Sequence, residues 1–325
     1  MNPVRLAIIG SGGIAQTHAA AIALIPEARL TAVCSRNPAS AATLAGPAGA
    51  RIFDTPEELA AWDGADAVLI ATPSGAHEEG ALPSIRAGKH VLCEKPLEIS
   101  TDRVRRMVAE AEKAGVTLAG FFPMRCGAAA MAIRAALDAG RFGRLTFLSA
   151  RVKWWRDQAY YSASSWRGTQ ALDGGGALMN QGIHAVDLLQ WFGGRPRETM
   201  AYAATLAHEG LEVEDTLTAS VRFENGALGT IEAATACHPG LDLTLDVCGD
   251  GGTATLVSDR LTFWQFREEL PGDEAIRSGA SGGKFGSGAS DPRAISCEGH
   301  RRQIADFLAA IRGEATKIPD GREAG

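Results

Sequence analysis

The sequence predicts two domains of different fold classes: an α/β domain with a parallel sheet, followed by an α+β domain with a mostly antiparallel open sheet. Three observations predict this. Residues 4–122 alternate short apolar segments with helix-like ones, the pattern of βαβ units. After Pro123 the strand-like segments become longer and the helices fewer. The length of 325 residues suits two domains of roughly 150 residues each. We therefore expect domains at 1–123 and 124–325.

The first domain is predicted to contain five strands, most of them followed by a helix. The strands are predicted at 4–10, 29–35, 65–73, 89–96 and 116–122. The helices are predicted at 14–26, 38–46, 55–62, from the end of the third strand to about Ala87, and at 100–115. Thr55, with Glu58 three residues later, has the capping-box pattern of a helix start. The parallel strands would have their carboxyl ends at one edge of the sheet, where ligands bind in such folds.

The second domain combines fewer helices with longer strands. Helices are predicted at about 127–139 and 176–192, and strands at 144–155, 198–207, 213–236, 241–249 and 252–258. Asn225-Gly226 divides the longest of these strands into two β-rich runs, which is a strong hairpin signal. The Gly/Ser-rich stretch 278–290 is predicted to be a mobile surface loop.

Charge and composition exclude several classes of protein. The 32 Lys and Arg against 38 Asp and Glu give a net charge of −6, so no basic field favours binding to nucleic acid or an anionic membrane. The six cysteines are scattered without C-x-x-C or zinc-like pairing with histidine, which indicates buried thiols in a reducing compartment and no metal site. The apolar run near the N-terminus is too short for a signal peptide or a membrane span. We expect a cytoplasmic protein.

The first strand runs into a glycine-rich turn, GSGGIA (10–15), which fits the pattern G-x-G-x-x-[G/A]. Gly10 permits a tight turn, Gly12 lets the backbone approach a pyrophosphate, and Ala15 lets the helix pack on the strand. The N-terminus of the helix offers free N–H groups to phosphates. We therefore predict a Rossmann domain whose dinucleotide contacts include Gly10, Ser11, Gly12, Gly13 and Ile14.

The end of the second strand indicates which dinucleotide is preferred. An acidic residue there bonds the ribose 2′-OH of NAD, whereas a small polar residue with an arginine accommodates the 2′-phosphate of NADP. This chain has Cys34-Ser35-Arg36-Asn37 and no acid. Ser35 can donate a hydrogen bond and Arg36 can form charge-assisted bonds to a phosphate, with a solvated surface arginine as the alternative. We predict NADP as the preferred cofactor and NAD as the alternative.

The fourth strand ends on two opposite charges and a proline, Glu94-Lys95-Pro96. The carboxyl edge of an open α/β sheet faces the ligand crevice, which places Lys95 beside a ligand. A surface lysine is the alternative, but the preceding residues are of buried-strand type and no helix follows before Ser100. A cis Pro96 would fix the turn and aim the lysine into the cleft.

A second polar cluster lies on the predicted helix 176–192. Asn180, His184 and Asp187 are spaced i, i+4 and i+7, which puts them on one helix face. Such a stripe in an otherwise apolar helix is costly unless it is used. The preceding glycines at 174–176 permit close approach of another backbone. We favour a functional His184 over a buried structural histidine, and a structural Asp187.

The run before that helix, 152–176, is dense in aromatic and arginine side chains. Aromatic faces stack on sugar C–H surfaces, while Arg and Asp bind hydroxyls or carboxylates. If the ligand is a sugar, the arginines favour an acidic or nucleotide-linked one. The substrate-binding candidates, each with packing or a subunit interface as the alternative, are Arg156, Tyr160, Trp166, Arg167 and Asp173.

Four motifs together resemble the glucose–fructose oxidoreductase / inositol dehydrogenase (Gfo/Idh/MocA) family: GSGGIA, ATPSGAH (71–77), AGKHVLCEKPLEIS (87–100) and LDGGGALMNQGIHAVDLLQWFGG (172–194). The resemblance runs in order from about Val4 to the segment 299–311. It implies a Rossmann domain, an open-sheet domain that forms homodimers or homotetramers, and hydride exchange between a nicotinamide and a sugar or cyclitol. Relatives usually continue past a segment such as IPDGREAG (318–325), so the C-terminus is expected to be short.

The resemblance also implies roles for single residues. It assigns His184 as the catalytic acid/base and Lys95 as its partner across the cleft, beside the developing alkoxide. Thr72, Pro73 and His77 match a segment that lies along the cofactor, with a purely structural histidine as the alternative for His77. Asn180 stands where many relatives have Asp. The remaining implied contacts are to the cofactor from Glu94 and Lys95 and to the substrate from Arg125 and Asn180.

Three functions fit these residues. The first is a sugar or cyclitol dehydrogenase that uses NAD(P). The second is a glycosidase-like relative that retains NAD and oxidises its substrate only transiently. The third is a cofactor-binding regulator without catalysis, against which the presence of both Lys95 and His184 argues.

Overall fold

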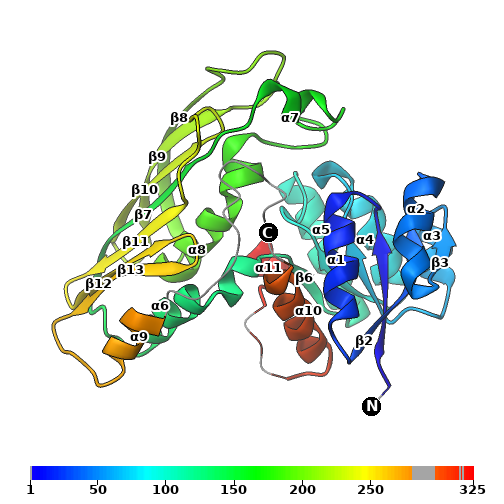
Figure 1. Cartoon of the computed structure of the whole chain (residues 1–325), viewed down its shortest axis with the longest axis horizontal. Helices are drawn as coiled ribbons and strands as arrows, with labels where there is room; N and C mark the ends of the chain where they lie inside the picture. Colours follow the sequence, from blue (N-terminus) through cyan, green and yellow to red (C-terminus); the bar gives the residue numbers. More distant parts are fainter. Residues whose placement is uncertain (1, 280–296, 315, 317) are drawn as a thin grey trace. The chain divides into compact units, whose positions relative to one another are not determined.

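The computed structural model describes residues 2–279, 297–314, 316 and 318–325, and these form two compact units (Figure 1). The first unit contains Met1–Pro123, Ala171–Gly174 and Cys297–Gly325. The second unit contains Met124–Gln170 and Gly175–Ser296. The first unit runs without interruption to Pro123, and the two later segments pack with it.

The first unit is built on a parallel sheet of six strands. Its order is β3-β2-β1-β4-β5-β6, which is the order of a Rossmann fold and confirms the predicted fold class. Strand order reverses between β1 and β4, and their carboxyl ends form the edge at which a dinucleotide binds in such sheets. The strands are β1 (Val4–Ile9), β2 (Ala28–Cys34), β3 (Arg51–Phe53), β4 (Ala67–Ile70), β5 (His90–Cys93) and β6 (Leu118–Gly120).

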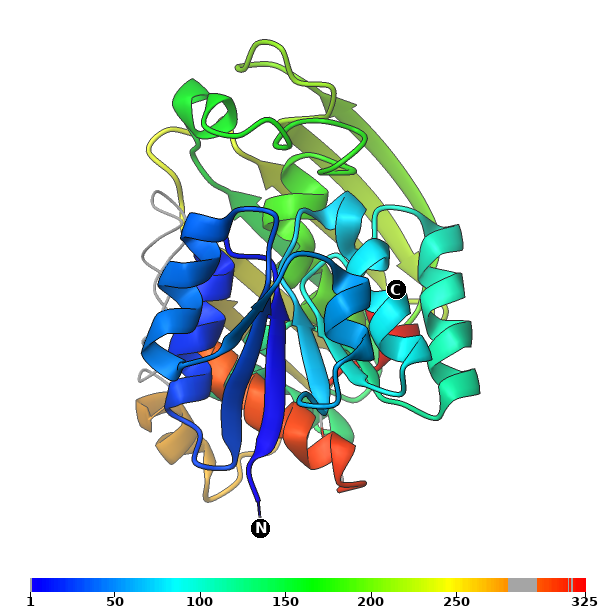
Figure 2. The same cartoon turned by 90° about the vertical axis from the view of Figure 1, so that its right-hand side faces the viewer.

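Helices cover both faces of this sheet (Figure 2). On one face, Leu6 and Ile8 of β1 pack in one core with Ile304, Phe307 and Leu308 of α10. Alternate residues of the same strand enter the core of the other face. The C-terminal segment therefore belongs to the first unit because α10 supplies part of its core. The helices are α1 (Gly13–Ala23), α2 (Pro38–Ala45), η1 (Gly46–Ala48), α3 (Pro56–Ala61), η2 (Ser74–Ala76), α4 (His77–Arg86), α5 (Thr101–Ala114), α10 (Glu298–Ile311) and α11 (Gly321–Ala324).

The second unit contains a mixed, mostly antiparallel sheet of seven strands, in the order β13-β12-β11-β7-β10-β9-β8. Only β7 and β10 pair in parallel. The Asn225-Gly226 hairpin is confirmed: Gly226 has φ +89° and the Asn225 side chain accepts the Ala227 N–H. The strands are β7 (Leu145–Lys153), β8 (Pro196–Ala204), β9 (Thr216–Phe223), β10 (Leu228–Ala234), β11 (Thr244–Gly249), β12 (Gly252–Val257) and β13 (Arg260–Phe266).

One face of the seven-stranded sheet is covered by α6 and α8 (Figure 1). Ile133 of α6 and Leu188 of α8 share a core with Leu148 of β7 and Val247 of β11. The expected helix 176–192 is divided, because residues 177–182 form a π-helical segment before α8 begins. The helices of this unit are η3 (Pro123–Cys126), α6 (Ala128–Asp138), α7 (Gln158–Ser162), η4 (Ala177–Gly182), α8 (Ile183–Gly193) and α9 (Asp273–Gly279). The surface loop expected at 278–290 lies, from residue 280 on, outside the described residues.

Candidate active site

The turn between β1 and α1 is shaped to accept an anion. Gly10 has φ +113°, and a Cβ there would lie 2.3 Å from the carbonyl oxygen of Ala71 at the end of β4, so only glycine fits. The N-cap residue of α1 is Gly12, and no side chain caps the helix. The N–H groups of its first turn therefore point toward a ligand without a competing side-chain acceptor. These residues fit the pyrophosphate of a dinucleotide.

The end of β2 lies beside this turn. The hydroxyls of Ser11 and Ser35 are 2.7 Å apart, so the first two strand ends are linked directly. The Asn37 N–H donates to the Ser35 hydroxyl, and the Asn37 side chain caps α2 by accepting the Ser40 N–H. Arg36 is exposed. No ion pair involves it among the described residues, so its guanidinium is available at the position where an adenosine ribose would lie.

The ATPSGAH segment after β4 is tied to the turn that follows β5. His77 is 1% exposed, and its ring nitrogens lie 2.8 Å from the Pro96 carbonyl oxygen and 3.0 Å from that of Thr72. Burial lowers the pKa of His77, so its ring is neutral at neutral pH and donates to only one of the two carbonyls. These contacts give His77 a structural connection between the two segments.

Glu94 and Lys95 follow directly on β5, and the Lys95–Pro96 peptide is cis. Glu94 is buried; one carboxylate oxygen is 2.9 Å from His18 Nε2 of α1, and the other accepts the Lys95 N–H at 3.2 Å. Burial alone would raise the pKa of Glu94, but the His18 hydrogen bond and the charges of His18, His300 and Lys95 lower it to about 2. Glu94 is therefore ionised throughout the neutral range.

The structure brings Asp173 into the same unit as Lys95. The loop Ala171–Gly174 packs on the first unit, where the Gly75 N–H donates to the Leu172 carbonyl. A Cβ on Gly75 would lie 2.3 Å from the Ala171 carbonyl oxygen, so glycine is needed for this approach. Burial lowers the pKa of Lys95, and the charges of Glu94 and Asp173 partly offset that effect. Asp173, predicted as a substrate contact, thus acts electrostatically on the lysine.

In the second unit, the segment η4, which leads into the helix of His184, is capped by a carboxylate. Glu214 accepts the N–H groups of Gly176 and Leu178, each at 3.0 Å, at the start of η4. A negative charge at this end interacts favourably with the helix dipole and stabilises the helix start. Asn180 lies within the π-helical segment and His184 in the first turn of α8. The three-residue polar stripe expected from regular helical spacing therefore begins in a segment of different period.

Arg125 and Asp187 form a buried ion pair within the second unit. Arg125 Nη2 is 2.7 Å from one Asp187 oxygen and Nε is 3.0 Å from the other, and both side chains are about nine-tenths buried or more. The guanidinium also lies 5.2 Å from the Trp191 ring centroid. Asp187 therefore has a buried partner in Arg125, whose predicted contact with substrate stays a prediction.

All substrate candidates of the run 152–176 except Asp173 form one cluster around Tyr160. The guanidinium of Arg167 lies 4.3 Å from the Tyr160 ring centroid and that of Arg156 lies 5.5 Å from it. The Trp166 ring centroid lies 5.2 Å from the guanidinium carbon of Arg167. The Tyr160 hydroxyl accepts from Gln181 Nε2 at 3.3 Å, which connects this cluster with the helix of Asn180 and His184.

Four polar residues with evident positioning contacts were missed by the sequence-based predictions. His18 holds Glu94, and Glu214 caps η4. His208 is buried between Asp215 Oδ2 at 2.9 Å and the Arg156 carbonyl oxygen at 2.7 Å, so it anchors the backbone of a substrate candidate. The contacts of His18 with Glu94, of Glu214 with the start of η4 and of His208 with Arg156 span 36 to 76 positions, whereas His208 and Asp215 are 7 positions apart. Only His18 lies within a helix, where it follows the polar residues Gln16 and Thr17, and the others lie between β8 and β9, so no local pattern marked them.

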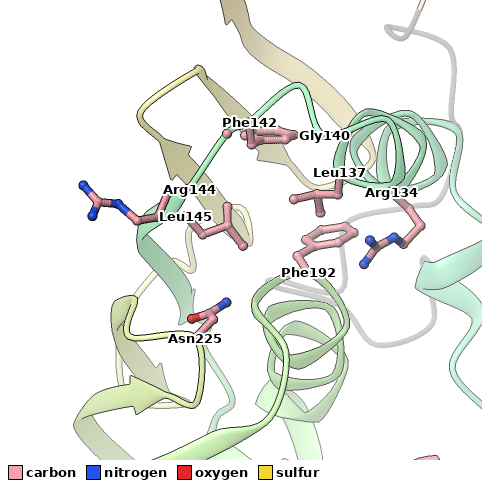
Figure 3. A pocket seen from close by; sticks show the side chains of 9 residues that line it. Arg134, Leu137, Gly140, Phe142, Arg144, Leu145, Phe192 and Asn225 are labelled. Carbon is pink, nitrogen blue, oxygen red and sulfur yellow. The ribbon is translucent and has the colours of Figure 1, made fainter.

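A cavity of about 320 Å³ lies elsewhere in the second unit, between α6, α8 and the start of β7 (Figure 3). Figure 3 shows Leu137 and Phe192 facing it, with Arg134 and Arg144 toward its rim. None of the predicted site residues lines this cavity. We therefore locate the candidate site by its polar chemistry and not by this hollow.

Three further features of the described residues concern membrane-spanning helices, metal ligands and disulfide bonds. No helix among them is long and apolar enough to cross a membrane. No three histidine, cysteine, aspartate or glutamate side chains in this part of the chain are grouped as metal ligands. All six cysteines, each within the described ranges, are free thiols.

Comparison with protein families gives two matches that together cover most of the chain. Residues 4–122 match the oxidoreductase family with an NAD-binding Rossmann fold, and residues 130–255 match the GFO/IDH/MocA C-terminal domain. Inositol 2-dehydrogenase 2 of Saccharopolyspora erythraea is 30% identical over 259 residues, which cover 78% of this chain and 73% of that protein. The 1,5-anhydro-D-fructose reductase of Ensifer adhaerens is 37% identical over 184 residues, but these cover only 55% of this chain and 53% of the reductase.

A solved structure is also similar over almost the whole chain. The WlbA dehydrogenase from Bordetella pertussis, in complex with NADH and UDP-GlcNAcA, has a TM-score of 0.91 and 34% sequence identity. The similarity covers 99% of this chain and 92% of that one.

Proposed function

The chain belongs to the GFO/IDH/MocA family of oxidoreductases with an NAD-binding Rossmann fold, and on this premise we propose that it transfers hydride between NAD(P) and a hydroxyl-bearing carbon of a sugar, sugar derivative or cyclitol. One observation carries the proposal. Lys95, with a pKa lowered by burial, follows β5, two strands from the uncapped N-terminus of α1 in the same sheet. A dinucleotide cradle and a perturbed lysine at one sheet edge are what such a reaction requires.

The proposed mechanism divides the work between Lys95 and His184. The bound nicotinamide supplies the hydride acceptor in oxidation and the donor in reduction. His184 takes the proton of the reacting hydroxyl, since an imidazole ordinarily titrates near neutral pH and can act in either direction. The Lys95 ammonium stabilises the negative charge that develops on the same oxygen, an effect that is strong where water is excluded. Asn180 and Asp173 orient neighbouring hydroxyls.

Screening sugars, sugar acids, nucleotide-linked sugars and cyclitols with both cofactors tests this function. A net change in nicotinamide absorbance on turnover supports a dehydrogenase. Cleavage of a glycoside without a net change favours the glycosidase-like alternative instead. Cofactor binding without turnover of any member of these classes contradicts the proposal and favours a regulator.

We also propose NADP as the preferred cofactor. The support is the Ser35-Arg36 pair without an acid at the end of β2, together with the lack of an ion pair for Arg36 in the described part of the chain. NAD is the alternative, and the related dehydrogenase that was solved with NADH favours it.

Replacing Arg36 with alanine should weaken NADPH binding by about tenfold or more and leave NADH binding within about twofold, because a charge-assisted contact to the 2′-phosphate is lost. Fluorescence titration with both cofactors measures this. Arg105→Ala on α5 is the matched control, since Arg105 is also exposed. Tighter binding of NADH than of NADPH by the unaltered protein contradicts the preference.

The substrate that we favour within this class is an acidic or nucleotide-linked sugar. Arg167 lies against Tyr160 and Trp166 and makes no ion pair within the described ranges. Buried polar atoms normally have a hydrogen-bond partner. Several buried polar atoms between 154 and 181 lack one among the described residues, which supports a polar ligand there; they include Trp154 Nε1, Ser164 Oγ, Arg167 Nε and Gln181 Oε1. The related structure with UDP-GlcNAcA supports the same class.

Replacing Arg167 with methionine should raise KM for an anionic sugar by about 10–100-fold, because a bidentate partner for carboxylate or phosphate is removed. KM for a neutral cyclitol should change little, and Arg167→Lys should restore part of the affinity. Steady-state kinetics with a matched pair of neutral and acidic sugars measures this. Arg195→Met, at an exposed arginine of the same unit, is the control. An equal change for both substrates would show that Arg167 serves packing.

We propose a homodimer or homotetramer as the assembly. Apolar side chains are exposed along the strands of the seven-stranded sheet, and clusters of this kind often mark protein interfaces. Those with the largest exposure on the strands are Phe147, Met200, Tyr202, Leu228 and Phe263.

A further inference from the structure

The turn that follows β5 is held by side chains from three different helices. His18 of α1 contacts Glu94, and His77 at the start of α4 contacts the Pro96 carbonyl. Arg103 of α5 donates to Glu98 at 3.1 Å and to the Gly75 carbonyl at 2.9 Å. Of these contacts, only the one from His18 reaches Glu94, the residue that precedes Lys95 and accepts its N–H.

The direction of the His18–Glu94 hydrogen bond follows from chemistry. An ionised carboxylate only accepts, so His18 Nε2 carries the hydrogen and donates it. The His18 side chain is fully buried, and its other nitrogen, Nδ1, has no hydrogen-bond partner among the described residues. The one hydrogen bond of the ring therefore goes to Glu94. The ring also contacts Phe121, at 4.5 Å between centroids, and His300, edge-on at 5.4 Å.

The two oxygens of Glu94 have different partners. Oε1 accepts from His18, and Oε2 accepts the backbone N–H of Lys95. Within the described residues, no other hydrogen bond reaches this carboxylate. Its orientation therefore depends on His18, and the Lys95 N–H bond depends on that orientation.

We propose that His18 is a positioning residue for Lys95: by holding one oxygen of Glu94, it keeps the other under the Lys95 N–H and fixes the backbone from which the lysine side chain projects. His18 is on the same helix whose N-terminus forms the dinucleotide cradle, so cofactor binding and the lysine backbone are connected through one rigid element. The kinetic part of this inference rests on the function proposed above. The structural part does not.

His18→Leu and His18→Gln provide the test. Leucine has a similar volume but no donor, whereas the glutamine amide can place an N–H near the position of Nε2. Site-resolved amide hydrogen exchange of Lys95, with and without NADH, reads the contact directly. We expect His18→Leu to accelerate exchange of the Lys95 amide by about tenfold, because losing one hydrogen bond makes local opening easier. His18→Gln should exchange within about threefold of the unaltered protein.

Two further variants distinguish loss of the His18–Glu94 contact from a general loss of stability. Ile22→Val removes one buried methyl group from the same helix without touching Glu94, and it should leave Lys95 exchange unchanged relative to its neighbours. Glu94→Gln acts at the other end of the contact and should accelerate Lys95 exchange as His18→Leu does. If the leucine variant does not fold, this variant carries the test. In the double variant His18→Leu/Glu94→Gln, the Lys95 amide should exchange no faster than in the faster of the two single variants, because both substitutions remove the same contact.

The kinetic readout is a split between kcat and KM. His18→Leu should lower kcat by about tenfold or more, leave KM for the sugar within about threefold, and be rescued in the glutamine variant. Unchanged Lys95 exchange in His18→Leu overturns the inference, as does an equal acceleration in Ile22→Val. Accelerated exchange in a protein whose unaltered form oxidises no sugar would overturn the proposed function while the positioning contact stands.

Discussion

Lys95→Met is expected to lower kcat by about 10³-fold while cofactor binding stays within a few fold. Removing a single donor to a developing oxyanion costs about 10²–10³-fold in comparable sites, and burial of Lys95 places it in the upper part of that range. Methionine keeps the length of the side chain but not the charge. Stopped-flow hydride transfer and fluorescence titration with the reduced cofactor measure the two quantities separately. Lys113→Met, on the exposed end of α5, is the control.

The pH dependence gives an independent check on Lys95. If the ammonium is the active form, kcat falls as the pH rises through the lysine pKa, which burial has lowered from its ordinary 10.5. The falling limb should therefore appear at a lower pH than for an ordinary lysine. Lys95→Arg keeps a charge that does not titrate in this range, so its residual activity should lack that limb. Turnover close to that of the unaltered protein in Lys95→Met contradicts the role.

His184→Ala is expected to lower kcat by about 10²–10⁴-fold, the usual contribution of a general acid/base. Cofactor affinity should not change, because His184 belongs to the second unit and the cofactor cradle is built from the first. Added imidazole should restore part of the activity by supplying the missing base. Gln190→Ala, on an exposed position of the same helix, is the matched control.

The pH profile of His184→Ala separates catalysis from folding. In the direction of oxidation the base must be neutral, so kcat/KM of the unaltered protein should rise with pH through the imidazole titration, and the variant should lose that rise. If both residues act on the same oxygen, as proposed, combining His184→Ala with Lys95→Met should cost much less than the product of the two single losses. A His184→Ala variant with a normal profile would contradict the assignment.

The fold was largely predictable because most of its elements carry local signals. The apolar runs of β1, β2, β4 and β5, the Thr55 cap and the Asn225-Gly226 turn are each decided by residues within a few positions. β3 was missed because it has three residues, of which only Phe53 is buried. The contribution of α10 to the first core was not predicted either, because its partners lie in the first strand and helix of the chain.

The candidate site likewise combines residues that local sequence patterns indicated with contacts that these patterns did not indicate. The motif residues Gly10, Lys95 and His184 were predicted from the sequence, since glycine-rich turns and charged strand ends are recognisable by spacing. The environment of Lys95 was not: the charges of Glu94, just after β5, and of Asp173, in a loop after residue 170, act on it, and His18 of α1 holds Glu94. The ion pair of Arg125 with Asp187 was not predicted either, because its two members are 62 positions apart.

By itself, the sequence determined the family, the parallel sheet with its dinucleotide cradle and the identity of the chemical groups, because these depend on short-range patterns and on residue types. Only the tertiary structure decided which of those groups are held, charged or already paired. Those properties depend on burial and on partners far apart in the chain. His18 illustrates the difference, since nothing near it in the sequence marks it, yet its hydrogen bond supports the carboxylate on which the backbone of Lys95 rests.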